Sequence, residues 1–464
     1  MFGYLIAFIS LFPPSPSPKL SKKTAVVEEQ CADDNSGTLF ALMFLDTEPT
    51  DRDIDLFITS TMTSQQTLVT LSTPANPSID LGVFAYTIDP LSSIIVTLPA
   101  ALKLAGNVRS DRGVRLVANG AVTVHGVNTE DRGACGGFMA VPLERLGYEY
   151  VAVNYWSDQV EGATLAEVGL VATEANTDIV IELKPGKQVG VLFDGAVYQS
   201  DDNNLIRVSL GAFETVQLQA SGDLTGSRIY STKRIAVFSG NVDTTVFSSS
   251  SDHIIEQLLP VGALGSTYNV VPLPGRTGER YHVIALEEET SIYIGFSNDA
   301  RQGFLQNVGD VYENSIFSAT QIRADKEVML VQYSVAQFET DAQLRGEPAM
   351  LLLPPEENYK TAHYFAVPAP ETSQYTAQLI LVSPDTGLTN IYVDDVVVPL
   401  SAWNEGASID NNRYYAILDT EPGFHRAYST DGSRFSVVVT GYVETQCAFS
   451  YPAGMCLEHT LVVS

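Results

Sequence analysis

The sequence is poor in basic residues and in charged residues overall. Its 464 residues include 26 Lys and Arg against 55 Asp and Glu, which gives a formal net charge of −29. Such a surface repels phosphate groups, which disfavours nucleic acids and anionic membrane surfaces as partners. Charged residues make up 17% and hydrophobic residues 45% of the chain. This balance argues against coiled-coil and disordered classes and predicts a soluble protein with a sizeable core.

Sequence motifs of common enzymes and metal sites are absent. H-E-x-x-H, G-x-S-x-G and the P-loop pattern do not occur, and no cysteines or histidines have the spacing of a zinc site. The acidic segments 47–55, 200–204 and 287–290 lack the complete calcium-loop pattern, so we expect ordinary solvated turns there. We therefore predict a non-enzymatic protein without cofactor or metal. The histidines are scattered along the chain: His125, His253, His282, His363, His425 and His459.

The chain has little that resembles a membrane segment. An apolar run at Tyr4–Phe12 is too short to span a bilayer, and prolines follow it from Pro13 to Pro18. An apolar run followed by such an exit is typical of a secretory signal. We predict a signal peptide and proline-rich linker over 1–30, one domain over 31–464, no membrane span, and a secreted, extracellular protein.

Cysteine is rare, with four residues at Cys31, Cys135, Cys447 and Cys456. An even count beside a secretory signal favours disulfides, and four cysteines permit three pairings. We favour Cys447 with Cys456, which closes a loop of about ten residues, and Cys31 with Cys135. Buried free thiols in an intracellular protein are the alternative.

Sustained helical periodicity is also missing, and short alternating runs take its place. Runs rich in Val, Ile, Thr, Tyr and Phe are separated by Gly, Pro, Asn and Asp, which predicts β-strands joined by turns. Turn residues recur about every eight to twelve positions, as in sandwiches and barrels, so the expected fold is all-β. Examples of these runs are residues 67–72, 93–99, 178–186, 215–220 and 433–442.

The runs recur in a longer pattern. A polar turn followed by an alternating strand occurs at Ala118–Asn128, Ser231–Asn241, Ala324–Ser334 and Asp431–Tyr442. The first three are followed by an apolar run, a proline and an aromatic-flanked strand, with Pro142, Pro260 and Pro354 in equivalent places. We predict four diverged antiparallel β-sandwich-like repeats, with a propeller-like closed arrangement as the alternative. The predicted repeats span 36–160, 161–274, 275–370 and 371–458.

Two adjoining segments carry a family resemblance. "SRIYSTKRIAVFSGN" at 227–241, followed by "DHIIEQLLPVGALGSTYNVVPL" at 252–273, resembles the signature of the N-terminal domain of the IgG Fc-binding protein family. The resemblance implies a secreted, non-enzymatic binding or scaffold protein that acts in mucus, cell adhesion or innate defence. By resemblance alone, its partner is an extracellular protein or glycoprotein, immunoglobulin-like or mucin-like. The fingerprint residues are Asp252, His253, Glu256, Gln257 and Pro260.

One departure from the family pattern directs attention upstream of the fingerprint. The resemblance implies a cysteine shortly after "FSG" and another just before "DH", whereas this chain has Ser251 at the second place. Without that crosslink, the loop from Asn241 to Ser250 is predicted to be unpinned. A partner is most easily recognised by such a loop or by a strand edge. The candidate binding residues are Asn241, Val242, Asp243, Phe247 and Ser251.

His253 and Glu256 are the one candidate for chemistry, because a spacing of three residues places both on one face of a helical turn. A metal or acid–base role needs a further ligand or a nucleophile, and no motif supplies one. We favour the interpretation that both side chains form structural hydrogen bonds with backbone groups. An extracellular hydrolase on a β scaffold and a matrix component without a specific ligand are the alternative functions.

Overall fold

The computed structural model describes most of the chain between residues 31 and 457. The described residues form 33 strands and six single-turn 3-10 helices, and none of these helices is long or apolar enough to cross a membrane. The prediction of an all-β fold is therefore confirmed. The described residues are 31, 34–47, 54–127, 136–156, 165–247, 250–276, 278–295, 301–335, 346–368, 375–384, 387–409, 412–443 and 447–457.

The strands follow one another in four groups, which we name units 1 to 4. Unit 1 contains β1 (Gly37–Leu42), β2 (Ile54–Ser60), β3 (Thr67–Ser72), β4 (Ala85–Ile88), β5 (Ser93–Leu98), η1 (Ala100–Leu102), β6 (Val108–Ser110), β7 (Val114–Val127) and β8 (Gly137–Met139). Unit 2 contains η2 (Leu143–Arg145), β9 (Gly147–Val151), β10 (Ala166–Ala172), β11 (Thr177–Glu182), β12 (Gly190–Phe193), β13 (Ala196–Gln199), β14 (Leu205–Leu210), β15 (Thr215–Ala220), β16 (Arg228–Thr245) and β17 (Ser251–Gln257).

Units 3 and 4 also consist of strands and single-turn 3-10 helices. Unit 3 contains η3 (Val261–Ala263), β18 (Gly265–Val270), β19 (Glu279–Ala285), β20 (Thr290–Ile294), β21 (Arg301–Leu305), β22 (Val311–Ile316), β23 (Thr320–Tyr333) and β24 (Met350–Leu352). Unit 4 contains η4 (Glu356–Asn358), β25 (Ala362–Val367), β26 (Tyr375–Ser383), η5 (Leu388–Asn390), β27 (Ile391–Val393), β28 (Val396–Val397), η6 (Leu400–Ala402), β29 (Trp403–Gly406), β30 (Arg413–Asp419), β31 (Gly423–Ser429), β32 (Ser436–Val443) and β33 (Cys447–Pro452).

One pairing scheme recurs in all four units, and all of its pairings are antiparallel. The first half of a long strand (β7, β16 or β23) pairs with the leading strand of its unit, and the second half pairs with the closing strand (β8, β17 or β24). In unit 4 the long strand is divided, so β31 pairs with β25 and β32 pairs with β33. The recurrence supports our proposal of four diverged repeats. It places β9 with β16 in unit 2, although the predicted first repeat, 36–160, contains β9.

The segments that connect unit 1 to unit 2, unit 2 to unit 3 and unit 3 to unit 4 have the same structure. The 3-10 helices η2, η3 and η4 begin after Pro142, Pro260 and Pro355, so the third equivalent proline is Pro355 rather than the predicted Pro354. Each of these prolines packs on the glycine that opens a leading strand. A Cβ on Gly147 would lie 2.3 Å from Cβ of Pro260, and one on Gly265 would lie 2.6 Å from Cβ of Pro355. A residue with a side chain at these glycine positions would displace the proline of the next connection. Each unit is therefore packed closely against the next.

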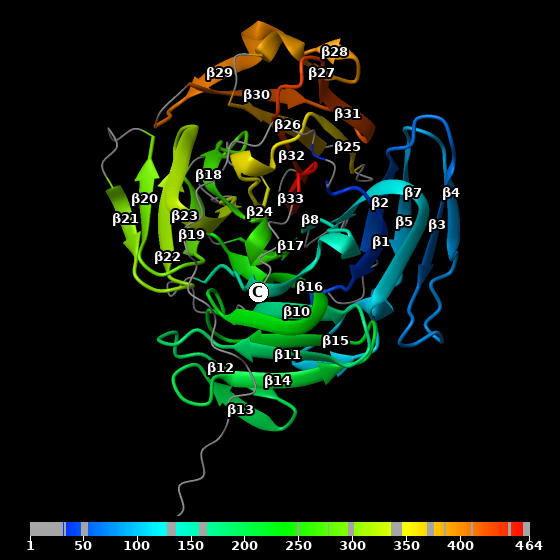
Figure 1. The fold of residues 1–464 in the computed structure, drawn as a ribbon, viewed down its shortest axis with the longest axis vertical. Coiled ribbons are helices and arrows are strands. Elements are labelled where there is room, and N and C mark those ends of the chain that lie inside the picture. Colours follow the sequence, from blue (N-terminus) through cyan, green and yellow to red (C-terminus); the bar gives the residue numbers. More distant parts are fainter. Residues whose placement is uncertain are drawn as a thin grey trace, which may run out of the picture.

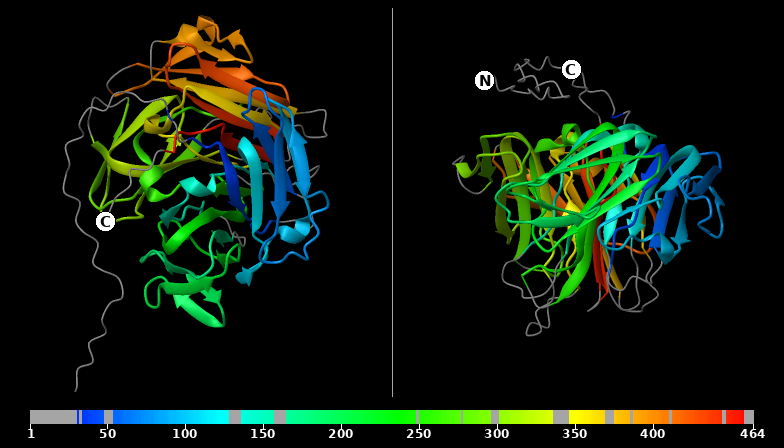
Figure 2. Two further views of the ribbon diagram at one scale, coloured as in Figure 1. Left: turned by 45° about the vertical axis from the view of Figure 1, so that its right-hand side comes forward. Right: turned by 90° about the horizontal axis from the view of Figure 1, so that it is seen from below.

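The units are arranged around a centre, in the propeller-like alternative that the sequence left open. Figure 1 shows unit 1 in blue and cyan, unit 2 in green, unit 3 in yellow-green and unit 4 in orange, with β8, β17, β24 and β33 innermost. β8 contacts β17 and β33, and β24 contacts the same two strands, so the four closing strands form a closed ring. Figure 2 shows three of the units standing side by side when the molecule is seen from below.

The hydrophobic core crosses the unit boundaries. One cluster of buried side chains is shared mainly by units 1 and 2, and a second joins unit 3 to residues of unit 4. A third contains Phe57 and Val127 of unit 1 together with Phe365, Phe435 and Tyr451 of unit 4. Because burial of apolar surface is the main favourable term in folding, no unit keeps its full stability without its neighbours.

A disulfide joins the start of unit 1 to the end of unit 4. Cys31 is bonded to Cys456 across a sequence separation of 425 residues, just before β1 and just after β33. Beside it, the backbone N–H of Asn35 donates to the carbonyl oxygen of Met455 at 3.0 Å. The predicted pairs, Cys447 with Cys456 and Cys31 with Cys135, are therefore wrong, because ring closure brings the two ends of the domain together. Cys135 lies outside the described residues, as does the predicted signal peptide.

We expect loss of this disulfide to weaken the whole ring. The double variant C31S/C456S should lose about 2–5 kcal/mol of unfolding free energy, because the crosslink restricts the unfolded chain over a very long loop. Urea denaturation followed by fluorescence measures the loss. Adding a reductant to the double variant is the control and should change little, and equal stability of variant and parent would contradict this role.

Candidate binding surface

The fingerprint residues Glu256 and Gln257 lie on β17, inside the ring of closing strands. Glu256 Oε1 accepts a hydrogen bond of 2.8 Å from the backbone N–H of Leu352 in unit 3. Gln257 Oε1 accepts one of 3.1 Å from the backbone N–H of Val141 at the end of unit 1. Both side chains are buried. They therefore satisfy backbone donors of the two adjacent units at a place where no sheet pairing does so.

His253 and Asp252 are buried as well and do not form a catalytic arrangement. His253 Nδ1 lies 3.8 Å from Glu167 Oε1. Burial, and then the charge of Lys103, lowers the pKa of His253 to about 3, while burial raises the pKa of Glu167 well above its usual value. His253 is therefore neutral near pH 7. Among the described residues no group of three His, Cys, Asp or Glu side chains is placed to hold a metal ion.

The predicted binding loop is shorter than the sequence indicated. β16 continues to Thr245, so Asn241 and Val242 lie in a strand, and both are buried. Asn241 is fixed by two hydrogen bonds to the backbone of Tyr155, of 2.9 Å at its Oδ1 and 3.0 Å at its Nδ2. These two residues are therefore unavailable to a partner. The loop prediction was wrong here because "SGNV" contains typical turn residues, whereas β10, β17 and the backbone of Tyr155, all in unit 2, supply the hydrogen bonds that keep it in a strand.

Ser251 keeps the turn closed without a crosslink. Its hydroxyl donates to Asp243 Oδ2 at 2.9 Å, and its backbone lies opposite Thr245 in the β16–β17 pair. The hydroxyl of Ser250 donates to Glu347 Oε1 in unit 3 at 2.9 Å. Burial is the main reason that the pKa of Glu347 rises to about 7. Strand pairing and polar contacts thus hold the described residues on both sides of the turn, which corrects the prediction that they are unpinned, whereas residues 248–249 lie outside the described residues.

Phe247 is the predicted residue that the turn presents to solvent. Its side chain is 54% exposed, and its φ is 52°, which is uncommon for a bulky residue. The guanidinium of Arg280 lies 4.2 Å from the centre of its ring. An aromatic residue that is exposed in a strained conformation is a reasonable candidate for function, because the strain must be offset by the surrounding structure.

Three residues of unit 3 extend this surface. Arg280 Nε lies 3.8 Å from Glu313 Oε1, and Glu313 Oε2 lies 3.3 Å from His282 Nε2. The hydrogen bond from His282 is the largest cause of the lowered pKa of Glu313. Phe317 follows β22 at the same end of the β19–β22 pair and is 79% exposed. We name Phe247, Arg280, Glu313 and Phe317 the β19 rim.

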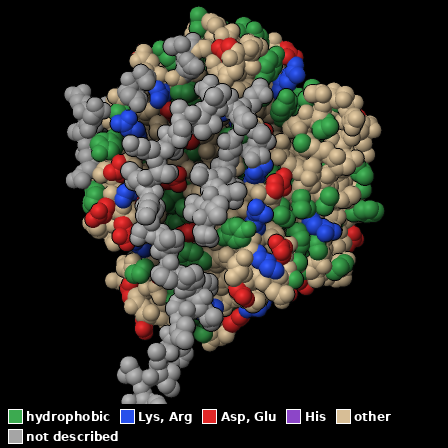
Figure 3. Space-filling model, in the orientation of Figure 1, with side chains coloured by type: hydrophobic (Ala, Val, Ile, Leu, Met, Phe, Trp, Pro, Cys, Tyr) green, Lys and Arg blue, Asp and Glu red, His purple; other side chains and the backbone are tan. Residues whose placement is uncertain are grey.

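Only Phe247 of the rim was predicted from the sequence. Arg280, Glu313 and Phe317 lie in strands and turns of ordinary composition, and nothing local distinguishes them from core or surface positions. Arg280 becomes a neighbour of Phe247 because unit 3 packs against the end of β16, and Glu313 lies beside Arg280. Figure 3 shows acidic and basic side chains interspersed over one face of the molecule, with hydrophobic side chains between them.

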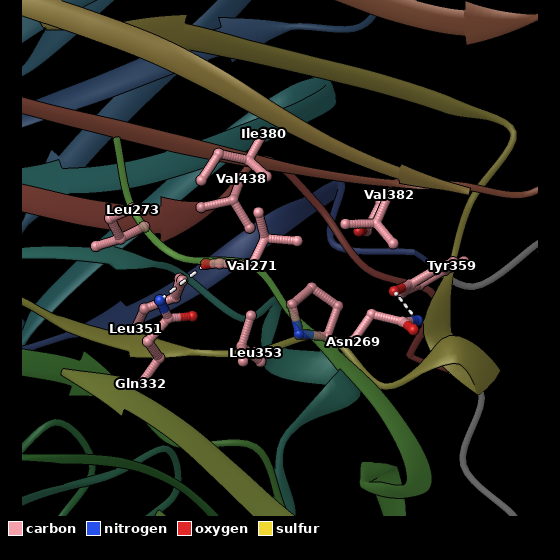
Figure 4. Close-up of a pocket in the computed structure, with 12 residues that line it drawn as sticks. Asn269, Val271, Leu273, Gln332, Leu351, Leu353, Tyr359, Ile380, Val382 and Val438 are labelled. Atoms are coloured by element: carbon pink, nitrogen blue, oxygen red, sulfur yellow. Dashed lines mark hydrogen bonds between the residues drawn. The ribbon is translucent and has the colours of Figure 1, made fainter. Parts of the chain in front are cut away.

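Internal cavities offer no ligand site between units 3 and 4. Figure 4 shows a pocket lined mainly by apolar side chains, with Asn269, Gln332, Tyr359 and Ser436 as its polar members, and its volume is about 10 Å³. Asn269 Nδ2 donates to the hydroxyl of Tyr359 at 3.1 Å, and Gln332 Nε2 donates to the carbonyl oxygen of Val271 at 3.0 Å. A volume of this size holds about one water molecule. This pocket is therefore too small for a larger molecule.

Comparison with known proteins shows the family of the chain. The family model for IgGFc binding protein matches residues 136–441, which is more than half of the chain. The chain belongs to the IgGFc-binding protein family. It is 25% identical over 280 residues to the human protein named IgGFc-binding protein. That match covers 60% of this chain and 5% of the human protein. No solved structure shows a significant match.

The family match covers β17 and the β19 rim but not the two ends of the ring. The matched residues begin at 136 and end at 441, so Cys31 and Cys456 both lie outside them. The fingerprint residues named from the sequence lie within the matched range, and Glu256 and Gln257 make buried contacts at the centre of the ring. A family signature made of such contacts identifies the fold, and it leaves the ligand to be found from the surface.

We expect Glu256 to make stability depend on pH. Burial raises its pKa well above the usual 4.5, although the hydrogen bond from Leu352 acts in the opposite direction. A group whose pKa is raised by folding contributes stability that is complete below its unfolded pKa and is lost as the pH rises. The side chain of the variant E256Q stays neutral at every pH. The unfolding free energy of E256Q should therefore rise relative to that of the parent by up to about 1.4 kcal/mol per pH unit between pH 5 and 8.

Urea denaturation of parent and variant at pH 5, 6, 7 and 8 measures this difference. E405Q, at an exposed position of unit 4, is the matched control and should follow the parent at each pH. A difference between E256Q and the parent that does not change with pH would show that Glu256 is ionised in the folded protein.

Proposed function

We propose that this member of the IgGFc-binding family is a secreted, non-enzymatic protein that binds an extracellular protein or glycoprotein. The family relationship supports a binding role. Secretion is supported by the apolar N-terminal run and by the disulfide between Cys31 and Cys456, since such bonds persist in oxidising compartments. A role in mucus, cell adhesion or innate defence fits this placement. The name of the human relative suggests the immunoglobulin Fc region as a candidate partner.

The observation that carries the proposal is the exposed stack of Phe247 on Arg280. Aromatic and arginine side chains dominate the binding energy of protein interfaces when polar residues surround them. Phe317 adds a second exposed ring, and Glu313 supplies a charge beside Arg280. The backbone pairing of β19 with β22 and β23 fixes the base of the rim, so little conformational freedom is lost on binding.

We expect F247A to weaken binding at least tenfold, because removal of a central aromatic anchor typically costs more than 1 kcal/mol. Surface plasmon resonance against immobilised Fc fragment and, separately, purified mucin measures this change. F84A is the matched control, since Phe84 is 69% exposed on unit 1, far along the chain from the rim. The melting temperatures of both variants should stay near that of the parent.

Two results would overturn the proposal. Equal affinity of F247A and the parent would exclude the rim as the binding site. If neither Fc nor mucin binds saturably, the protein has neither of these partners, and a structural role in the matrix becomes the better explanation.

A further inference from the structure

A buried lysine lies against the segment that precedes β1, beside the disulfide. Lys360 follows η4, and its backbone exchanges two hydrogen bonds with that of Phe435, of 3.1 and 2.9 Å. Nζ of Lys360 lies 2.6 Å from Asp34 Oδ2 and donates to Asn35 Oδ1 at 2.9 Å. The side chain of Lys360 is 5% exposed. An amine, a carboxylate and a carboxamide therefore meet where the start of unit 1 packs against unit 4.

Contacts with the neighbouring chain hold these three groups in place. Oδ1 of Asp34 accepts hydrogen bonds from the backbone N–H and the hydroxyl of Ser36, at 2.8 and 2.6 Å, so Oδ2 is left to face Lys360. A Cβ on Gly454 would lie 2.5 Å from Oδ1 of Asn35, so only glycine lets the chain pass so close to the carboxamide. The folded protein thus positions the amine beside the carboxamide, which is the condition for a fast intramolecular reaction.

The carboxamide of Asn35 is bonded on one side only. Asn35 is fully buried, and its Nδ2 has no hydrogen-bond partner among the described residues. A buried NH2 group without an acceptor costs stability, so its presence in a native structure needs a reason. A reaction that releases this nitrogen removes the cost. The unpaired Nδ2 therefore points beyond an ordinary ion pair.

Burial also favours the uncharged form of the amine. It lowers the pKa of Lys360, although Asp34 acts in the opposite direction. Burial by itself would raise the pKa of Asp34, but Lys360 and Ser36 outweigh it, and the pKa of Asp34 is lowered. Asp34 is thus an ionised carboxylate that can accept a proton. A desolvated lysine beside such a base is a nucleophile.

We propose that Lys360 and Asn35 join in an intramolecular isopeptide bond, with Asp34 as the catalytic acid and base. Asp34 Oδ2 takes a proton from the ammonium, and the free electron pair of Nζ attacks Cγ of Asn35. The two protons that Nζ loses pass through Asp34 to Nδ2, the Cγ–Nδ2 bond breaks, and an ammonium ion leaves. The positive charge of the lysine departs with the leaving group, and no oxidant or reductant is needed.

This bond connects the start of unit 1 to the start of unit 4. It closes a loop from residue 35 to residue 360, whereas the disulfide also encloses residues 361–456. A neutral amide replaces a buried ammonium and an unpaired NH2 group, both of which are costly in a protein interior. The side chain of Asp34 is 26% exposed, which gives the ammonium ion a path to solvent. Unlike the disulfide, the amide persists under reducing conditions.

Mass spectrometry of the purified full chain tests the proposal directly. After reduction of the disulfide, the protein should weigh about 17 Da less than its sequence requires, because one ammonia is lost. Trypsin should not cleave after Lys360, so a branched peptide should join the peptide that ends at Arg52 to residues 346–413. The full sequence mass with normal cleavage after Lys360 would overturn the proposal. A link to Asp34, which releases water in place of ammonia, would overturn it as well.

Two variants separate the roles of the residues. N35A should have its full sequence mass. D34N keeps both reacting residues and should also have its full mass, because an amide cannot take the proton from the ammonium. N404A, at an exposed position of unit 4, is the matched control and should keep the loss of about 17 Da. Near-UV circular dichroism shows that each variant is folded. A folded D34N that carries the link would overturn the role of Asp34, and a link in N35A would overturn that of Asn35.

Discussion

The contact among β8, β17, β24 and β33 is the constraint on which the rest of the structure depends. Each of these closing strands meets two others, and the hydrophobic clusters cross the boundaries between units. No unit buries its apolar surface alone, so the ring forms as a whole or not at all. Units 1 and 2, units 2 and 3, and units 3 and 4 are each connected by a segment in which a proline precedes a 3-10 helix. Units 4 and 1 are joined by the disulfide between Cys31 and Cys456.

This arrangement explains why polar residues occupy the centre of an otherwise apolar ring. Strands of adjacent units meet there without regular sheet pairing, so some backbone donors need side-chain acceptors. Glu256 and Gln257 supply two of them, one on each side of β17. Replacing either by an apolar residue would leave a buried N–H unsatisfied, which costs more than an ordinary surface change. A pattern that resembles an active site in the sequence is therefore a structural connection between units.

The outer surface of the ring is free of these constraints. The β19 rim lies at one end of the β19–β22 pair and combines residues of units 2 and 3. It offers an exposed aromatic ring, Phe247, beside the guanidinium of Arg280. Binding at the rim requires no change in the core, because β19 is already paired with β22 and β23.

The sequence by itself determined the strands, their class and the family. Alternation with period two and regularly spaced turn residues are local signals in the sequence. The prolines that recur between the repeats can also be recognised there. It did not determine the cysteine pairing, the extent of β16 or the members of the rim. The cysteine pairing and the rim depend on which units become neighbours when the ring closes, as with Cys31 against Cys456 and Arg280 against Phe247. The extent of β16 depends on its pairing with β10 and β17. Contacts between residues far apart in the chain leave no local pattern, so only the tertiary structure decided them.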